Sequence, residues 1–146
     1  LYLNTWMDLY SRIIVGWKID THMQESLVID SLQKALYKRQ PAPELIVHSD
    51  RGGQYASTAF KELLNENKCA QSMSDADNPY DNAYAESFFS RFKAELLQKG
   101  AFESKEHANN DVFEFIEMYY NTQRLHSGIG YQSPVNYEKL YYQTKN

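Results

Sequence analysis

Two carboxylates and a lysine have the residue types and local settings of a metal-dependent site for phosphoryl transfer. Asp50 closes the apolar run 45–49, which predicts a short buried strand ending in a turn. Glu86 lies early in a segment of helical spacing, and Lys93 follows two turns later on the same face. An acid at a strand end and another on a helix can bind hard cations. Two such cations can align a displacement at phosphorus, so these residues predict phosphodiester chemistry on nucleic acid.

The same residues also allow other interpretations. Taken alone, Glu86 and Lys93 fit an ordinary solvated amphipathic helix whose other side packs through Phe88, Phe92 and Leu96. Paired carboxylates also serve carbohydrate hydrolases, which would act without a metal. A third interpretation is a non-catalytic module for assembly or DNA binding, which would keep its partner after both acids are neutralised.

Composition limits the class of protein. The chain has 146 residues, of which 42% are hydrophobic and 14% aromatic, and this predicts one domain with a core. It contains neither an apolar run of ~18 residues nor a signal peptide, so we expect no membrane partner. Cys69 is the single cysteine, which excludes an internal disulfide and a cysteine-based zinc site. The net charge of −4 is unusual for a DNA binder, but metal-binding acids contribute to it.

The elements that position the candidate residues follow from the spacing of apolar residues. Period-two alternation predicts two strands, 1–8 and 12–19, joined through a short link as a hairpin. Further predicted strands cover 44–49 and 69–73, and a polar loop covers 74–82. Helical spacing and end signals predict helices over 23–39, 57–67, 83–98, 104–121 and 134–142. Strands interleaved with helices predict an α/β fold with a mixed sheet flanked by helices.

An ordered set of motifs resembles the integrase core of bacterial insertion-sequence transposases, over nearly the whole chain. The matching strings are Tyr2-Leu3, Asp8-Leu9, Ser11-Arg12, Ile14-Val15-Gly16-Trp17, His48-Ser49-Asp50-Arg51-Gly52-Gly53-Gln54-Tyr55, Ser72-Met73-Ser74, Asp81-Asn82-Ala83-Tyr84-Ala85-Glu86-Ser87-Phe88-Phe89, Lys93-Ala94-Glu95, Tyr120-Asn121, Arg124, His126-Ser127, Tyr131 and Ser133-Pro134. The ordered set is far more specific than any one motif.

The resemblance implies a ribonuclease H-like fold and DNA cleavage and strand transfer by an aspartate-aspartate-glutamate triad. It implies two Mg²⁺ or Mn²⁺ ions as cofactors, with Asp50 matching the second acid and Glu86 the third. DNA, both transposon ends and target, is the implied partner, with Lys93, Arg51 and Asn82 as candidate DNA contacts. A homo-oligomer in the bacterial cytoplasm, bound to the nucleoid through DNA, completes this expectation.

The sequence departs from the family at the first acid. In the family that aspartate lies on a strand preceding the hairpin, and residues 1–146 contain no such strand, so we expect an N-terminally truncated core with weak or no activity. Asp8 is the only early acid, and it could substitute for the first aspartate as a metal ligand. It matches an acidic position in the hairpin turn, so we expect it instead to cap the turn or pair with Arg12. The missing strand is central in the family sheet. The sheet could close this gap or a second chain could fill it, and we expect self-association or distortion near Asp50.

Several other residues have two open interpretations. Arg51 either contacts phosphate or is solvated, and Asn82 either orients DNA or caps the helix after it. His48 is expected to serve the strand end more than a metal. Arg124 and His126 are expected to fix the C-terminal turn. An aromatic group is expected in the core, although an exposed tyrosine in it could stack on unpaired bases; its members are Phe113, Phe115, Tyr119 and Tyr120.

Overall fold

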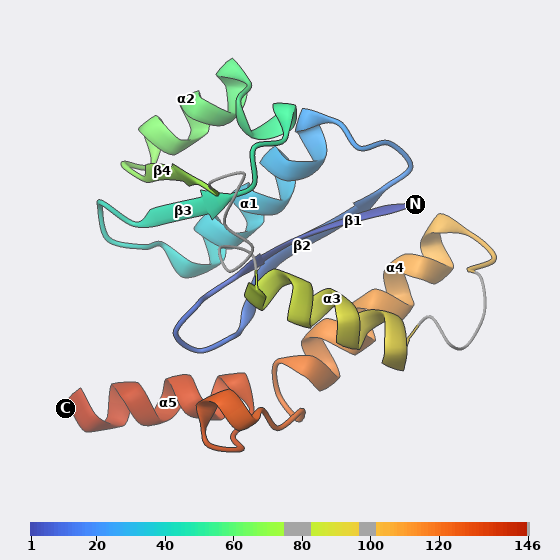
Figure 1. Ribbon diagram of the computed structural model, residues 1–146, viewed down its shortest axis with the longest axis vertical. Coiled ribbons are helices and arrows are strands. Elements are labelled where there is room, and N and C mark those ends of the chain that lie inside the picture. Colours follow the sequence, from blue (N-terminus) through green and yellow to red (C-terminus); the bar gives the residue numbers. More distant parts are fainter. Residues whose placement is uncertain (75–82, 97–101, 146) are drawn as a thin grey trace. The chain divides into compact units, whose positions relative to one another are not determined.

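The computed structural model describes residues 1–74, 83–96 and 102–145, except for the side chains of residues 83–86 and 94 (Figure 1). The predicted loop over 74–82 therefore lies almost wholly outside the described residues. None of the helices within the described ranges is long and apolar enough to cross a membrane.

The chain folds as two compact units, and each has buried side chains of its own. The first unit comprises Leu1–Trp6 and Val15–Phe89, and the second comprises Met7–Ile14 and Ser90–Asn146. Helix α3 (Ala83–Glu95) contributes residues to both units.

The predicted hairpin is confirmed, with strands β1 (Tyr2–Met7) and β2 (Ile14–Asp20) forming a two-stranded sheet. Asp8 shapes the link, because its Oδ1 accepts hydrogen bonds from the backbone N–H of Tyr10 at 2.8 Å and of Ser11 at 3.1 Å. This is the turn-capping role expected of Asp8.

Helix α1 (Glu25–Arg39) follows the hairpin and ends two residues before Pro41, as predicted. Gln40 adopts a left-handed conformation with φ 43°, and its N–H donates to the carbonyl of Leu36 at 2.8 Å. Gly16 on β2 lies so close to α1 that a Cβ there would stand 2.4 Å from the Ser31 carbonyl oxygen. The absence of a side chain at Gly16 therefore permits the contact between hairpin and helix.

Strand β3 (Ile46–Ser49) pairs in parallel with β4 (Ala70–Met73), with His48 opposite Ser72. Between these strands lie a 3₁₀ turn, η1 (Gly53–Tyr55), and helix α2 (Thr58–Glu66). The N-cap predicted for α2 is confirmed, because Ser57 Oγ accepts from Phe60 N at 3.2 Å.

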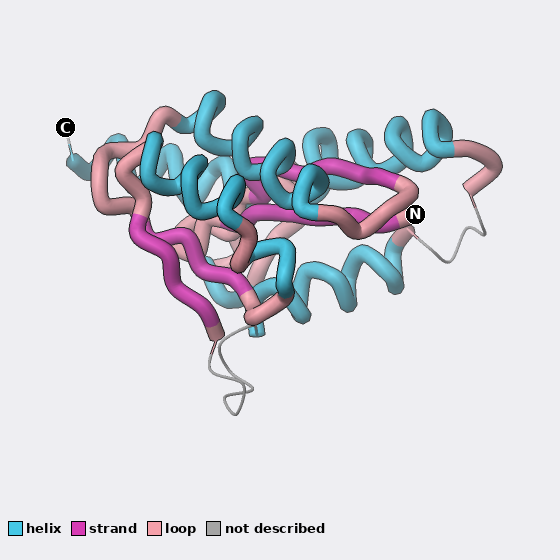
Figure 2. Tube along the Cα trace, turned by 90° about the horizontal axis from the view of Figure 1, so that it is seen from above, coloured by secondary structure: helices cyan, strands magenta, loops and turns pink. Residues whose placement is uncertain are grey.

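The first unit has a hydrophobic core formed by α1, β3, η1 and α2. Its buried members are Val28, Leu32, Leu36, Val47, Tyr55, Phe60, Leu63 and Leu64. Trp6 of β1 packs against this core, with its ring stacked on Phe60 at a centroid distance of 6.1 Å. Even so, the strands form two separate pairs, β1–β2 and β3–β4, and Figure 2 shows them as two magenta pairs. Within the described residues, the sheet therefore does not close through a β1–β3 pairing.

The second unit is helical apart from the hairpin link. Its elements are the end of α3, α4 (Lys105–Phe113), the π-helix η3 (Glu114–Tyr120), the 3₁₀ turn η4 (Ser127–Ile129) and α5 (Pro134–Lys145). The sequence predicts one regular helix over 104–121, but the second half is wound as a π-helix, with Asn121 N donating to Ile116 O at 3.0 Å. The predicted end of α3 near Gly100 lies outside the described residues.

Asn121, at the end of η3, is bonded to the first residue of β2. Its Oδ1 accepts from Ile14 N at 2.9 Å, and its Nδ2 donates to Ile14 O at 3.0 Å. Asn121 is 3% exposed, so both polar ends of this buried amide are satisfied by one residue.

Candidate functional site

Asp50 lies directly after β3, where its side chain is exposed. Its Oδ1 accepts a hydrogen bond from Gly52 N at 2.7 Å, and its backbone carbonyl accepts from Ser49 Oγ at 2.9 Å. These bonds form a short turn that holds the carboxylate at the carboxyl end of the strand. The predicted placement of Asp50 at a strand tip is therefore confirmed.

His48 ties the ends of the two parallel strands together. Its Nδ1 lies 2.8 Å from Ser72 Oγ and its Nε2 lies 3.2 Å from Ser74 Oγ. Ser74 N also donates to Ser49 O at 2.8 Å, which extends the pairing one residue beyond the strands. Both ring nitrogens of His48 are thus engaged at the strand ends, in line with the structural role expected for it.

Arg51 fastens the Asp50 turn to the end of β4. Its Nε donates to the carbonyl of Ser74 at 2.7 Å, although the residue as a whole is exposed. Because a guanidinium has five N–H donors, this bond leaves Arg51 able to contact an anion. Gly53, two residues further, has no atom within 4 Å of where a Cβ would stand, so close packing does not require a glycine there.

A buried polar network that was not predicted from the sequence connects Tyr55, in the 3₁₀ turn after Asp50, to β1 and α1. Asn4 Nδ2 donates to Tyr55 Oη at 2.9 Å, and Asn4 Oδ1 accepts from Ser31 Oγ at 2.7 Å. Trp6 Nε1 donates to Ser31 Oγ at 2.9 Å. Burial raises the pKa of Tyr55, and the negative charge of Asp50 raises it further. In the sequence, this network could have been predicted from Asn4, a polar residue within the strand β1.

The remaining predicted site residues are only partly described. Position 86 lies in the first turn of α3, but the side chain of Glu86 lies outside the described residues, as does the whole of Asn82. Lys93 is exposed on α3 and belongs to the second unit, whereas Asp50 belongs to the first. Over the ranges 1–74, 83–96 and 102–145, no three His, Cys, Asp or Glu side chains gather closely enough to hold a metal ion.

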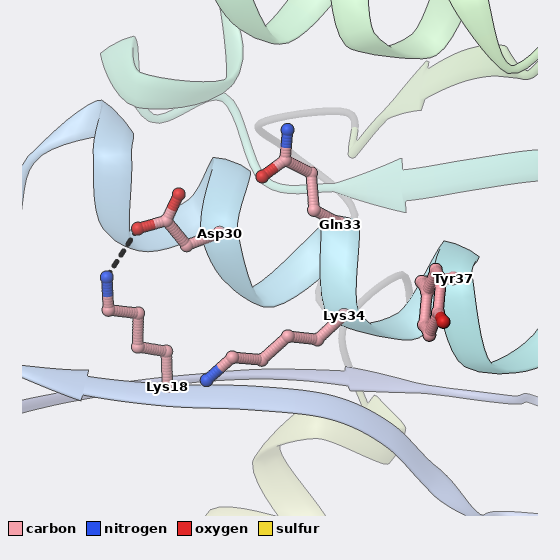
Figure 3. A pocket seen from close by; sticks show the side chains of 5 residues that line it. All are labelled: Lys18, Asp30, Gln33, Lys34 and Tyr37. Atoms are coloured by element: carbon pink, nitrogen blue, oxygen red, sulfur yellow. Dashed lines mark hydrogen bonds and ion pairs between the residues drawn. The ribbon is translucent and has the colours of Figure 1, made fainter.

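An open pocket on the first unit lies between β2 and α1 (Figure 3). Its lining contains two lysines, one acid, one amide and one tyrosine, namely Lys18, Lys34, Asp30, Gln33 and Tyr37. Lys18 and Asp30 form an ion pair, so the carboxylate is already engaged. None of the predicted site residues lines this pocket, and a single paired acid makes it a poor site for a cation.

Comparison with known protein families identifies the family to which the chain belongs. A family model described as integrase core domain matches residues 1–79, and a second model with the same description matches residues 67–134. The chain belongs to the integrase core domain family. The resemblance drawn from the sequence motifs is therefore confirmed.

Relatives of this chain include transposases of insertion sequences. The transposase for insertion sequence element IS904 of Lactococcus lactis is 45% identical over 95% of this chain and 55% of its own length. The transposase InsF for insertion sequence IS3A of Escherichia coli is 41% identical over 94% of this chain and 48% of its own length. The chain thus spans about half the length of these relatives.

Solved structures of integrase cores share the fold. The catalytic core domain of BIV integrase superposes with a TM-score of 0.66 at 15% identity, covering 99% of this chain and 90% of that one. A chain of the simian T-cell lymphotropic virus intasome in complex with PP2A regulatory subunit B56 gamma gives a TM-score of 0.72 at 14% identity. The match covers 92% of this chain and 46% of that one. The predicted ribonuclease H-like α/β fold is confirmed by these likenesses.

Proposed function

We propose that this chain is the catalytic core of a DNA transposase, a polynucleotidyl transferase of the aspartate-aspartate-glutamate type. The observation that carries the proposal is the exposed Asp50 carboxylate, held at the carboxyl end of β3 within an integrase core domain. Relatives at 41–45% identity are named as transposases of insertion sequences, which supports DNA cleavage and strand transfer as the reaction.

Asp50 and Glu86 are the proposed ligands of two Mg²⁺ or Mn²⁺ ions in the complete enzyme. The described part of the site fits such ions, because Asp50 offers a hard oxygen donor whose orientation is fixed by Gly52 N. Bound divalent ions of this kind activate the attacking oxygen and stabilise the leaving oxygen of a phosphodiester. The protein's contribution is to hold the carboxylates at a strand end and on a helix.

DNA is the proposed partner, and a second copy of the chain is the proposed assembly partner. Lys93 is exposed on α3 and is suited to pair with a backbone phosphate. Arg51 keeps donors beyond the one used on Ser74 O, and Asn82 is proposed to contact DNA just before the same helix. These contacts would position DNA without reading its sequence.

We propose further that the core is incomplete within residues 1–146. The two strand pairs share one hydrophobic core, yet β1 and β3 are not paired with each other in the described structure. A strand placed between them would complete a single sheet and, by the resemblance, would carry the first aspartate. We therefore expect weak or no activity from these residues alone.

The test is a crystal structure of the chain soaked in Mn²⁺, with anomalous data and the separation of the Asp50 and Glu86 carboxylates recorded. A manganese peak shared by carboxylates ~4–6 Å apart supports the proposal. Carboxylates that lie far apart on an otherwise intact fold contradict it.

A nuclease and strand-transfer assay on labelled DNA complements the crystal structure, and it uses the whole transposase that contains this core. Asp50→Asn and Glu86→Gln should each abolish activity, whereas Glu62→Gln, which removes an exposed acid on α2, should not. If both acid variants keep their activity and still bind DNA, the result would favour a non-catalytic DNA-binding module.

A further inference from the structure

A polar cluster in the second unit connects the end of α3 to the segment after η3. Arg124 Nε donates to Glu95 Oε1 at 3.4 Å, and Arg124 Nη1 approaches the carbonyl of Leu125 at 3.4 Å. The Arg124 side chain is 15% exposed and the Glu95 side chain 31%, so this ion pair is more shielded than an ordinary surface pair. Glu95 is the last residue of α3, so the pair anchors the end of that helix.

His126 completes the cluster in its neutral form. Its Nδ1 lies 3.5 Å from Arg124 Nη1, and because arginine has no acceptor, Nδ1 accepts and the proton resides on Nε2. The Tyr120 ring meets the imidazole edge-to-face at a centroid distance of 4.9 Å. Burial, followed by the positive charges of Arg124, Arg12 and Arg91, lowers the pKa of His126 to about 4, against a smaller opposing effect of Glu95.

Two polar atoms of the cluster already lack a hydrogen-bond partner. Glu95 Oε2 and His126 Nε2 are both shielded from solvent and have no partner among the described residues. Removal of the Arg124 guanidinium would leave Glu95 Oε1 without its ion-pair partner as well. A partly shielded carboxylate that loses its partner is less stable, so the Arg124 pair favours the folded end of α3.

Apolar contacts secure the same side of the helix. Phe92 and Leu96 are each 7% exposed, and the Phe92 ring meets Phe115 of η3 at a centroid distance of 5.6 Å. Lys93 and Glu95 are two residues apart, which places their side chains about 200° apart around the helix axis. Lys93 is exposed, whereas Glu95 faces Arg124. The Glu95 side chain, held by Arg124, is therefore on nearly the opposite side of α3 from Lys93.

We propose that Arg124, acting through Glu95, is a positioning residue that orders the last turn of α3 and so fixes Lys93 for contact with a DNA phosphate. The part concerning DNA rests on the proposed function. The part concerning the helix stands on the contacts within the second unit alone.

The first experiment needs no DNA and measures amide hydrogen exchange and the titration of His126 by NMR. In Arg124→Gln, amides 92–96 should exchange about tenfold faster, since a shielded ion pair is lost. The pKa of His126 should rise, because a neighbouring positive charge is gone. Lys139→Gln, which removes an exposed lysine of α5, should change neither quantity. Arg124→Lys retains the charge, so its exchange rates should lie between those of the wild type and Arg124→Gln. If Arg124→Gln does not fold, the exchange rates of Arg124→Lys test the proposal.

Exchange at 92–96 that stays at the wild-type rate in both Arg124 variants would overturn the proposal, whatever His126 does. The second experiment measures strand-transfer kinetics in the whole transposase. Arg124→Gln should lower kcat about tenfold with KM little changed, and Lys93→Gln combined with it should cause no further loss.

The outcomes separate the two proposals. Activity that survives Asp50→Asn contradicts the proposed function, and the exchange experiment still decides whether Arg124 orders the helix. Activity abolished by Asp50→Asn but unaltered by Arg124→Gln leaves the proposed function standing and overturns the role of Arg124 in presenting Lys93.

Discussion

The Asn4 side-chain amide donates a hydrogen bond to the Tyr55 hydroxyl at 2.9 Å, and this bond joins β1 to the 3₁₀ turn that follows Asp50. Asn4 and Tyr55 are each 8% exposed. Because β1 and β3 are not paired through their backbones in the described structure, side-chain bonds of this kind and the shared core connect the hairpin to the Asp50 strand.

Tyr55→Phe should therefore lower the free energy of unfolding by about 1–2 kcal/mol, because it leaves the buried Asn4 amide without its acceptor. Urea denaturation measures the change. Tyr37→Phe is the matched control, since Tyr37 is 83% exposed and should shift stability by no more than about 0.5 kcal/mol. Equal losses in the two variants would contradict this role for Asn4.

Gly16→Ala should destabilise the first unit by about 2 kcal/mol or more, because the added Cβ would stand 2.4 Å from the Ser31 carbonyl oxygen and 2.8 Å from Ala35 Cβ. Both obstacles belong to α1 and cannot move as a flexible side chain would. Gly53→Ala is the control, as nothing lies within 4 Å of its Cβ position. Thermal unfolding followed by circular dichroism distinguishes the two.

Lowering the pH should reduce the stability of the fold, because His126 becomes protonated. The pKa of His126 is about 4 in the folded state, against the ordinary histidine value of 6.5 in the unfolded chain, so between these values the unfolded chain takes up a proton that the folded chain does not. The free energy of unfolding should therefore fall as pH drops through this range, by about 1 kcal/mol after allowance for partial solvent exposure. His126→Gln should reduce this pH dependence, whereas the exposed His22→Gln should leave it unchanged.

If Asp50 and Glu86 are metal ligands as proposed, Mn²⁺ should raise the melting temperature of the chain slightly, by about 1–3 °C at millimolar concentration. The rise should vanish in Asp50→Asn and persist in Glu62→Gln. Differential scanning calorimetry with and without the ion provides the measurement. A rise that survives Asp50→Asn would place the ion elsewhere.

Residues 1–146 alone should self-associate, because β1 and β3 each pair on one side only within the described structure. The apolar side chain of Ile46 on β3 is 68% exposed and favours such pairing. Multi-angle light scattering should show species larger than a monomer, and Ile46→Lys should reduce them more than Tyr37→Lys. A monodisperse monomer with a cooperative melt counts against this prediction.

Much of the fold could be predicted because local signals determine it. Pro41 ends α1, Ser57 caps α2, and alternation in the first twenty residues predicts the hairpin. Asp50 could be placed at a strand tip for the same reason, since an apolar run followed by two glycines has few other solutions.

The features that could not be predicted depend on contacts between segments that are far apart in the sequence. The bonds of His48 to Ser72 and Ser74 follow from the parallel register of β3 and β4, which no local pattern specifies. Glu95 reaches Arg124 only because α3 lies against the segment after η3. Apolar spacing over 104–121 predicts a helix but cannot distinguish an α from a π winding.

The π winding of Glu114–Tyr120 has a consequence for insertions and deletions. A turn closed between residues five apart, as from Asn121 N to Ile116 O, contains one residue more than an α turn. Removing one exposed residue from this stretch, such as Met118, would return it to α pitch while everything after it keeps its angular phase. Removing one residue from the regular helix α4 would instead rotate all that follows by about 100° and separate Asn121 from Ile14. Length variation among related chains should therefore be tolerated at η3 and excluded from α4.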